Sequence, residues 1–66
     1  MQIVVNGEAR AIADGLSLYA LIEQMSLPPA RIAIELNREV VRRADWPETF
    51  LAAGDKLEIV HFVGGG

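Results

Sequence analysis

The chain has 66 residues, no cysteine and a formal net charge of −3. Hydrophobic residues make up 52% of it and charged residues 23%, which is typical of a folded domain and not of a disordered segment. A chain of this length buries only about 60% of the surface that it exposes when unfolded, which leaves no room for an enclosed enzyme pocket. We therefore expect one domain that is not an enzyme, with a folded body of residues 1–63 and a flexible tail of residues 64–66.

The same features exclude several kinds of partner. Without cysteine, and with a single histidine, the chain has no donor set for a metal site, and we expect no permanently bound cofactor. A negative net charge disfavours nucleic acid, whose binding depends on Lys and Arg contacts to phosphates. No run reaches the ~20 apolar residues of a membrane span, and the start lacks the pattern of a signal peptide. These features favour a cytoplasmic protein without a membrane partner, and we expect a monomer when free.

The first 12 residues predict a β-hairpin. Apolar and other residues alternate from residue 2 to residue 6, and Asn6-Gly7 follows, a pair that tolerates the positive φ angles of a tight turn. We therefore expect paired strands at residues 2–6 and 8–12.

A helix is predicted next. Ser17 is a good N-cap, and apolar residues recur after it at helical spacing: Leu18, Leu21, Ile22 and Met25. Leu16 and Leu21 are spaced as a hydrophobic staple. Pro28-Pro29 ends the helix by about residue 26.

The second half predicts three more strands. Residues 32–36 alternate cleanly, and Asn37-Arg38 turns the chain into a short strand at residues 39–41. Residues 42–53 follow neither period and predict a loop, with one helical turn around Trp46-Pro47. A last strand covers residues 56–63. The order is β-β-α-β-β-β, in which one helix covers one face of one sheet.

The chain ends on three glycines, Gly64, Gly65 and Gly66, directly after a strand. Glycine has no Cβ, so such a tail is slim enough to enter a slot that excludes any side chain. It would deliver the carboxylate of Gly66, which is a poor electrophile until adenylation by ATP gives it a leaving group. The alternative is a frayed end without a function.

Three segments carry a resemblance to a known family: "MQIVVNGE", "IELNREVVRRADW" and "LAAGDKLEIVHFVGGG". Together they make the whole chain similar to the ThiS family of prokaryotic sulfur carriers, which are ubiquitin-like β-grasp proteins. The resemblance implies an α+β fold in which a mixed sheet of about five strands packs on one helix. Arg42, where many relatives have proline, and Arg38, in a turn that often holds glycine, depart from the family pattern.

The resemblance also implies a chemistry and a set of partners. A ThiF-type adenylyltransferase would use ATP to activate Gly66 as an acyl adenylate. A cysteine persulfide on a sulfur donor would then displace AMP, and the resulting thiocarboxylate would pass its sulfur to a ThiG-type thiazole synthase in thiamine biosynthesis. One alternative is the small subunit of molybdopterin synthase, which the short length of this chain disfavours. A second is a β-grasp interaction module whose tail is incidental.

The last strand predicts a docking surface. Leu57 and Ile59 share the face that we assign to the helix side, which places Val60 and Phe62 on the opposite face. Exposed apolar residues beside the tail predict a partner-binding patch, whereas a covering loop would make them edge residues of the core.

Five other side chains are candidates for a function. His61 is the only imidazole, but nothing nearby in sequence orients it as a general base. Arg38, Arg42 and Arg43 form a basic group in the sequence, which is either a solvated face or a contact for a partner's carboxylates. Trp46 is expected to cover the core, with a role in an interface as the alternative.

Overall fold

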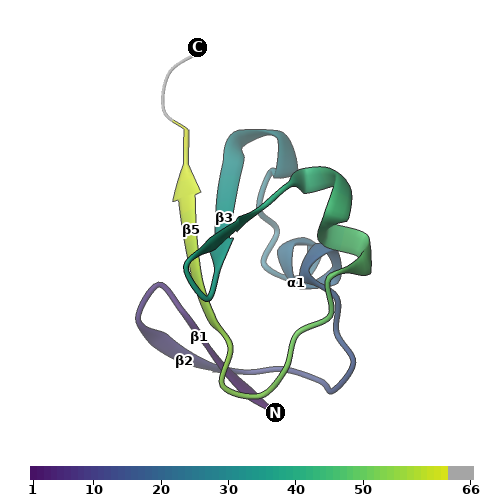
Figure 1. Cartoon of the computed structure of the whole chain (residues 1–66), viewed down its shortest axis with the longest axis vertical. Coiled ribbons are helices and arrows are strands. Elements are labelled where there is room, and N and C mark those ends of the chain that lie inside the picture. Colours follow the sequence, from purple (N-terminus) through teal and green to yellow (C-terminus); the bar gives the residue numbers. More distant parts are fainter. Residues whose placement is uncertain (63–66) are drawn as a thin grey trace.

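The computed structural model describes residues 1–62, in which a five-stranded mixed sheet packs against one helix (Figure 1). The helix is α1, Leu18–Gln24. The strands are β1 (Gln2–Val5), β2 (Glu8–Ala11), β3 (Ile32–Leu36), β4 (Glu39–Val41) and β5 (Lys56–His61). Two short 3₁₀ helices are also present, η1 (Pro29–Arg31) and η2 (Arg43–Glu48). The predicted order of strands and helix is confirmed.

Strand β5 occupies the centre of the sheet, whose order is β2-β1-β5-β3-β4. It runs parallel to β1, with Val5 opposite Leu57, and antiparallel to β3, with Ile32 opposite His61. The C-terminal end of β5 therefore lies beside the N-terminal end of β3, at the same end of the sheet. The predicted strand at residues 56–63 is shorter in the structure, since β5 ends at His61, and Val63 lies outside the described residues.

Both predicted hairpin turns form, with positive φ angles at their two central residues. Asn6 and Gly7 have φ values of 50° and 83°, and Asn37 and Arg38 have values of 52° and 73°. A left-handed backbone is favourable for glycine and tolerable for asparagine, but it strains an arginine. Asn6 therefore belongs to a turn and not to the first strand, where the alternation placed it.

Helix α1 begins as predicted and ends earlier. The Ser17 Oγ accepts a hydrogen bond from the Ala20 N–H at 3.1 Å, which caps the first turn. At the other end Ser26 has a φ of 56°, and the Leu27 N–H donates to the Ile22 carbonyl at 3.2 Å. This is the Schellman pattern, which closes a helix before the prolines can do so.

The core lies between α1 and the sheet. Leu18, Leu21 and Ile22 of the helix are fully buried. Trp46 is 1% exposed, and its Nε1–H donates to the Val41 carbonyl at 3.0 Å, so the prediction that it covers the core is confirmed. The expected single helical turn is the longer η2, which brings Trp46 to this position.

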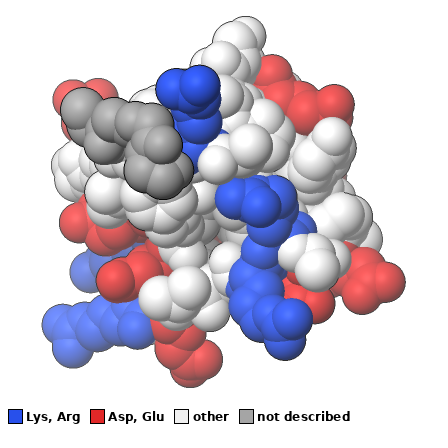
Figure 2. All heavy atoms as spheres, turned by 90° about the horizontal axis from the view of Figure 1, so that it is seen from above, with Lys and Arg blue, Asp and Glu red and all other residues white. Residues whose placement is uncertain are grey.

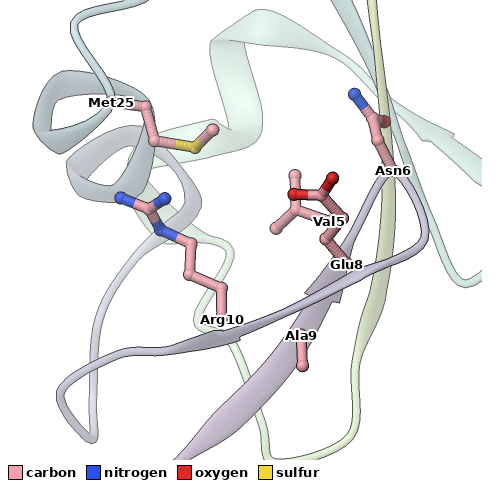
Figure 3. A pocket seen from close by; sticks show the side chains of 6 residues that line it. All are labelled: Val5, Asn6, Glu8, Ala9, Arg10 and Met25. Carbon is pink, nitrogen blue, oxygen red and sulfur yellow. The ribbon is translucent and has the colours of Figure 1, made fainter.

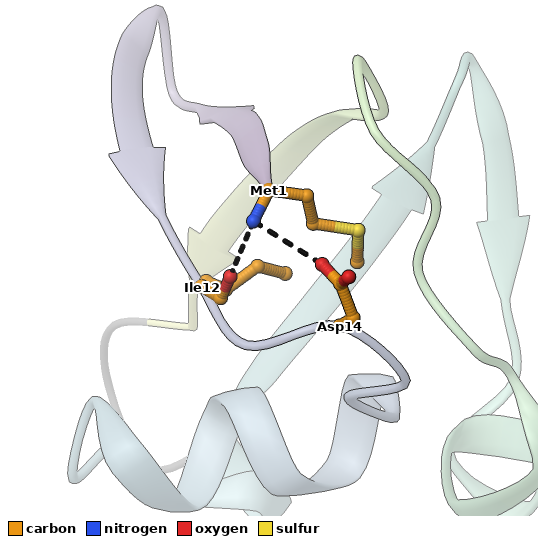
Figure 4. A network of polar contacts seen from close by, with 3 residues as sticks. All are labelled: Met1, Ile12 and Asp14. Carbon is orange, nitrogen blue, oxygen red and sulfur yellow. Dashed lines mark hydrogen bonds and ion pairs between the residues drawn. The ribbon is translucent and has the colours of Figure 1, made fainter.

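The start of the chain is tied to the segment after β2. The Met1 amino group donates to the Ile12 carbonyl at 2.8 Å and forms an ion pair with Asp14 at 3.3 Å (Figure 4). Across residues 1–62, no helix is long and apolar enough to cross a membrane.

Candidate docking surface beside the C-terminal tail

The two faces of β5 differ in exposure as predicted. Leu57 and Ile59 face the helix and are 1% and 8% exposed. Val60 and Phe62 lie on the open face of the sheet and are 57% and 55% exposed. Within residues 1–62, no loop therefore covers Val60 and Phe62. Their role in binding a partner stays a prediction.

Strand β3 extends this exposed surface sideways. The register places Ala33 opposite Val60, and the Phe62 N–H donates to the Arg31 carbonyl at 2.8 Å, which holds the last described residue of the chain against β3. Ala33, Val60 and Phe62 are called the apolar patch below. Contact of such apolar side chains with water is unfavourable, and a partner that covers the patch removes this contact.

The other half of the open face is charged. An open hollow of about 780 Å³ lies there, lined by β1, β3, β5 and the two hairpin turns. Its charged side chains are Glu35, Glu58, Arg38 and Lys56. Both signs are present in equal number, so this region has no net preference for a cation or an anion. The apolar patch is therefore confined to the end of the sheet where β5 finishes.

The basic group predicted from Arg38, Arg42 and Arg43 does not form. Arg38 lies in the turn beyond Leu36, whereas Arg42 and Arg43 follow the far end of β4. The five residues of β3 separate the two ends by roughly 13 Å, because a strand rises about 3.3 Å per residue. The β3–β4 hairpin therefore places Arg38 at one end of these strands and Arg42 and Arg43 at the other.

The structure groups Arg31, and not Arg38, with Arg42 and Arg43. Arg31 precedes β3 and its carbonyl accepts a hydrogen bond from the Phe62 N–H, so all three arginines lie at the end of the sheet where β5 finishes. Arg43 donates to the Pro29 carbonyl at 2.9 Å and lies over the Trp46 ring at 5.9 Å. None of these arginines forms an ion pair within residues 1–62. Figure 2 looks onto this end and shows Lys and Arg side chains toward the middle of the view and also at its lower left, with Asp and Glu mostly around the edge.

His61 and the glycine tail complete the list of predicted site residues. The exposed His61 imidazole makes no hydrogen bond to any residue from 1 to 62, so nothing in this part orients it as a base. Gly64, Gly65 and Gly66 lie outside the described residues. In residues 1–62 no three His, Asp or Glu side chains gather closely enough to hold a metal ion.

A second hollow was not predicted from the sequence. It has a volume of about 290 Å³ and lies between β2 and the end of α1 (Figure 3). Its lining residues are Val5, Asn6, Glu8, Ala9, Arg10 and Met25. The strand and the helix end meet only through the tertiary fold, so no local sequence signal marks this hollow.

The comparisons with known proteins agree on one family. The family model described as "ThiS family" matches residues 3–66. The chain is 30% identical to the sulfur carrier protein ThiS of Escherichia coli, and the match covers 100% of both chains. It is also 36% identical over all 66 residues to a thiazole synthase of Paramagnetospirillum magneticum. The chain spans only 20% of the length of that relative.

The solved structures give the same result for the fold. A crystal structure of the thiamine biosynthesis protein ThiS from Geobacter metallireducens matches with a TM-score of 0.86 and 32% identity, covering 100% of both chains. A solution structure of a thiamine biosynthesis protein from the same organism gives a TM-score of 0.81 and covers 88% of that chain. The predicted α+β fold of the β-grasp type is confirmed.

Proposed function

This chain belongs to the ThiS family, and from that premise we propose that it is a sulfur carrier of thiamine biosynthesis whose working group is the carboxylate of Gly66. The observation that carries the proposal is the extent of the match. The family model reaches Gly66, and the similarity to the E. coli sulfur carrier runs over both chains in full. The similarity therefore includes the glycine tail and is not confined to the fold.

The proposed chemistry modifies one group, the carboxylate of Gly66. On a ThiF-type enzyme, a carboxylate oxygen of Gly66 attacks the α-phosphate of ATP and pyrophosphate leaves. The terminal sulfur of a cysteine persulfide on the donor protein attacks the acyl carbon, and AMP leaves with the oxygen. A thiol then cleaves the acyl disulfide and forms a new disulfide with the donor cysteine, which releases the thiocarboxylate. The chain is a substrate in each step and not a catalyst.

The structure supports this proposal through the surface next to the tail. The apolar patch of Ala33, Val60 and Phe62 lies at the end of the strand that leads to the glycines. An enzyme that binds this patch would hold the tail at a fixed starting point while the glycines cross a narrow channel. We propose that Val60 and Phe62 dock on the activating enzyme, and that Gly64 and Gly65 form the slim neck.

The thiazole synthase relatives support the final acceptor. Two proteins with that name, from Paramagnetospirillum magneticum and Magnetococcus marinus, each contain a segment 36% identical to this whole chain. Carrier and synthase sequences within one polypeptide favour transfer of sulfur from one to the other. We therefore propose a ThiG-type thiazole synthase as the acceptor, with all steps in the cytoplasm and no cofactor bound permanently. The names of the relatives favour this pathway over molybdopterin synthesis.

Intact mass separates the carrier from an interaction module. After incubation with a ThiF-type enzyme, ATP, a persulfide donor and a thiol that cleaves the acyl disulfide, a carrier gains the mass difference between one sulfur and one oxygen atom. Without ATP the mass stays unchanged. An unchanged mass in the complete reaction, with an active enzyme, favours the interaction module instead.

Removal of Gly66 tests which group is modified. The deletion shortens the tail by about 3.3 Å and withdraws the carboxylate from the α-phosphate, where attack requires approach to about 3–3.5 Å. We expect ATP–pyrophosphate exchange to be lost while the melting temperature is unchanged. A C-terminal valine added after Gly66 is the matched control for length, and it should also stop exchange. Exchange at the unmodified rate by the shortened chain would contradict the proposal.

A further inference from the structure

Asn6 lies where β1 ends, and its side chain continues the pairing of β1 with β5. The Asn6 N–H donates to the Leu57 carbonyl at 2.8 Å, after which the chain turns away into β2. The side-chain Oδ1 then accepts a hydrogen bond from the Ile59 N–H at 2.7 Å, and the Nδ2 donates to the Ile59 carbonyl at 3.3 Å. The side-chain amide thus replaces the peptide group that a longer β1 would supply. Figure 3 shows the Asn6 side chain beside the β5 ribbon, apart from Arg10 and Met25.

The Asn6 contact is the last hydrogen bond along the edge of β5 that faces β1. Leu57 and Ile59 direct their main-chain groups toward this edge. The residues between and after them, such as Phe62, direct theirs toward β3, and the Phe62 N–H donates to the Arg31 carbonyl. Within residues 1–62, no hydrogen bond to β5 on the β1 side lies closer to the C-terminus than that of Asn6. The strand is therefore held from both edges only as far as Ile59.

We infer that Asn6 is a positioning residue, which fixes the direction in which β5 presents the glycine tail to the activating enzyme. The inference rests on the proposed function. With the Asn6 contact, the end of β5 is fixed between β3 and the β1–β2 turn. Without it, the end of β5 is held by β3 alone and can pivot about that single edge. A pivot at Ile59 moves the tail together with Val60 and Phe62, relative to Ala33 and the rest of the sheet.

Asn37 provides a matched control at the other end of the same strand. It has almost the same backbone conformation as Asn6, with φ values of 52° and 50°. Its N–H donates to the Lys56 carbonyl at 2.8 Å, and its Oδ1 accepts from the Lys56 N–H at 3.0 Å. Both asparagines therefore bind β5 through the main-chain N–H and the side-chain Oδ1, whereas the Asn37 Nδ2 donates to the Asp55 Oδ1 at 3.1 Å and only Asn6 lies near the tail.

The test compares Asn6→Gly with Asn37→Gly. Glycine retains the positive φ and removes only the side-chain contacts. Kinetics of adenylation are measured with a ThiF-type enzyme at a temperature where circular dichroism shows all variants folded. We expect Asn6→Gly to lower kcat about tenfold and to raise KM by a smaller factor, because the apolar side chains remain available for docking while the tail loses its alignment with the sheet. Asn37→Gly should keep both parameters, and Asn6→Asp, which retains the acceptor for the Ile59 N–H, should have an intermediate kcat.

A second measurement needs no enzyme. Residual dipolar couplings of the His61 and Phe62 amides report the direction of the end of β5 relative to the sheet. Asn6→Gly should change them and Asn37→Gly should leave them unchanged. An equal loss of kcat in the two variants, or unchanged couplings in Asn6→Gly, overturns the inference. If the unmodified chain is not adenylated at all, the proposed function fails, and the couplings still decide whether Asn6 positions the strand.

Discussion

Strand β5 carries apolar side chains on both faces, but the two faces have different surroundings. Leu57 and Ile59 lie under α1 and are almost fully buried, whereas more than half of Val60 and Phe62 is exposed. Burial of the first pair stabilises the fold, and exposure of the second pair does not. Apolar character alone therefore does not distinguish a core residue from a docking residue. Position relative to the single helix does.

The largest expected difference between the faces is in stability. Leu57→Ala should lower the free energy of unfolding by about 2–5 kcal/mol, since it leaves a cavity under the helix. Val60→Ala, on the exposed face, should change it by less than about 0.5 kcal/mol. Urea unfolding followed by circular dichroism measures both values. Similar losses in the two variants would show that the open face also contributes to the core.

The second expected difference is in partner binding. Phe62→Asp should weaken binding to the activating enzyme by about 2 kcal/mol, the size of an interface hot spot, with the fold retained. Phe50→Asp is the control, because Phe50 is 64% exposed but lies beside Ser17, away from β5. Isothermal titration calorimetry gives both affinities. If the two substitutions weaken binding equally, a general effect of added negative charge explains the loss and the apolar patch is not the docking surface.

The division of β5 into two faces could be predicted because it depends on local alternation. Side chains two residues apart share a face of a strand, so Leu57 and Ile59 separate from Val60 and Phe62 without knowledge of the fold. The Asn6-Gly7 turn and the Ser17 cap are equally local signals. Each of these predictions needs only the residues that take part in the feature.

Features that depend on distant contacts could not be predicted in this way. Asn6 and Ile59 are 53 positions apart, so the sequence near Asn6 signals a turn and nothing about β5. Likewise, the β3–β4 hairpin separates Arg38 from Arg42, and the antiparallel pairing of β3 with β5 brings Arg31 beside Phe62. The glycine tail has no side chains, so its proposed role depends on the family resemblance and on chemistry.

The smallest expected effect concerns Arg38, which lies in the turn after β3 and belongs to neither face of β5. Its φ of 73° is strained for an L-residue by about 1–2 kcal/mol, and glycine removes that strain at an entropic cost of about 0.5–1 kcal/mol. Arg38→Gly should therefore raise the free energy of unfolding by about 0.5 kcal/mol. Arg38→Ala removes the same charge and keeps the strain, so it should give no increase, and urea unfolding of the pair isolates the backbone effect.

Binding by the same two variants decides where the docking surface ends. Arg38 lines the charged hollow with Glu35 and Glu58, about 13 Å along β3 from the apolar patch at a rise of about 3.3 Å per residue. Both variants should bind the activating enzyme within about twofold of the unmodified chain, because exposed charges at this distance contribute little. A clear loss of affinity in both would extend the docking surface over the whole open face. Arg38 would then act with Arg42 and Arg43 as a contact for a partner's carboxylates, which is the alternative to a solvated face, through a partner broad enough to reach both ends of β3.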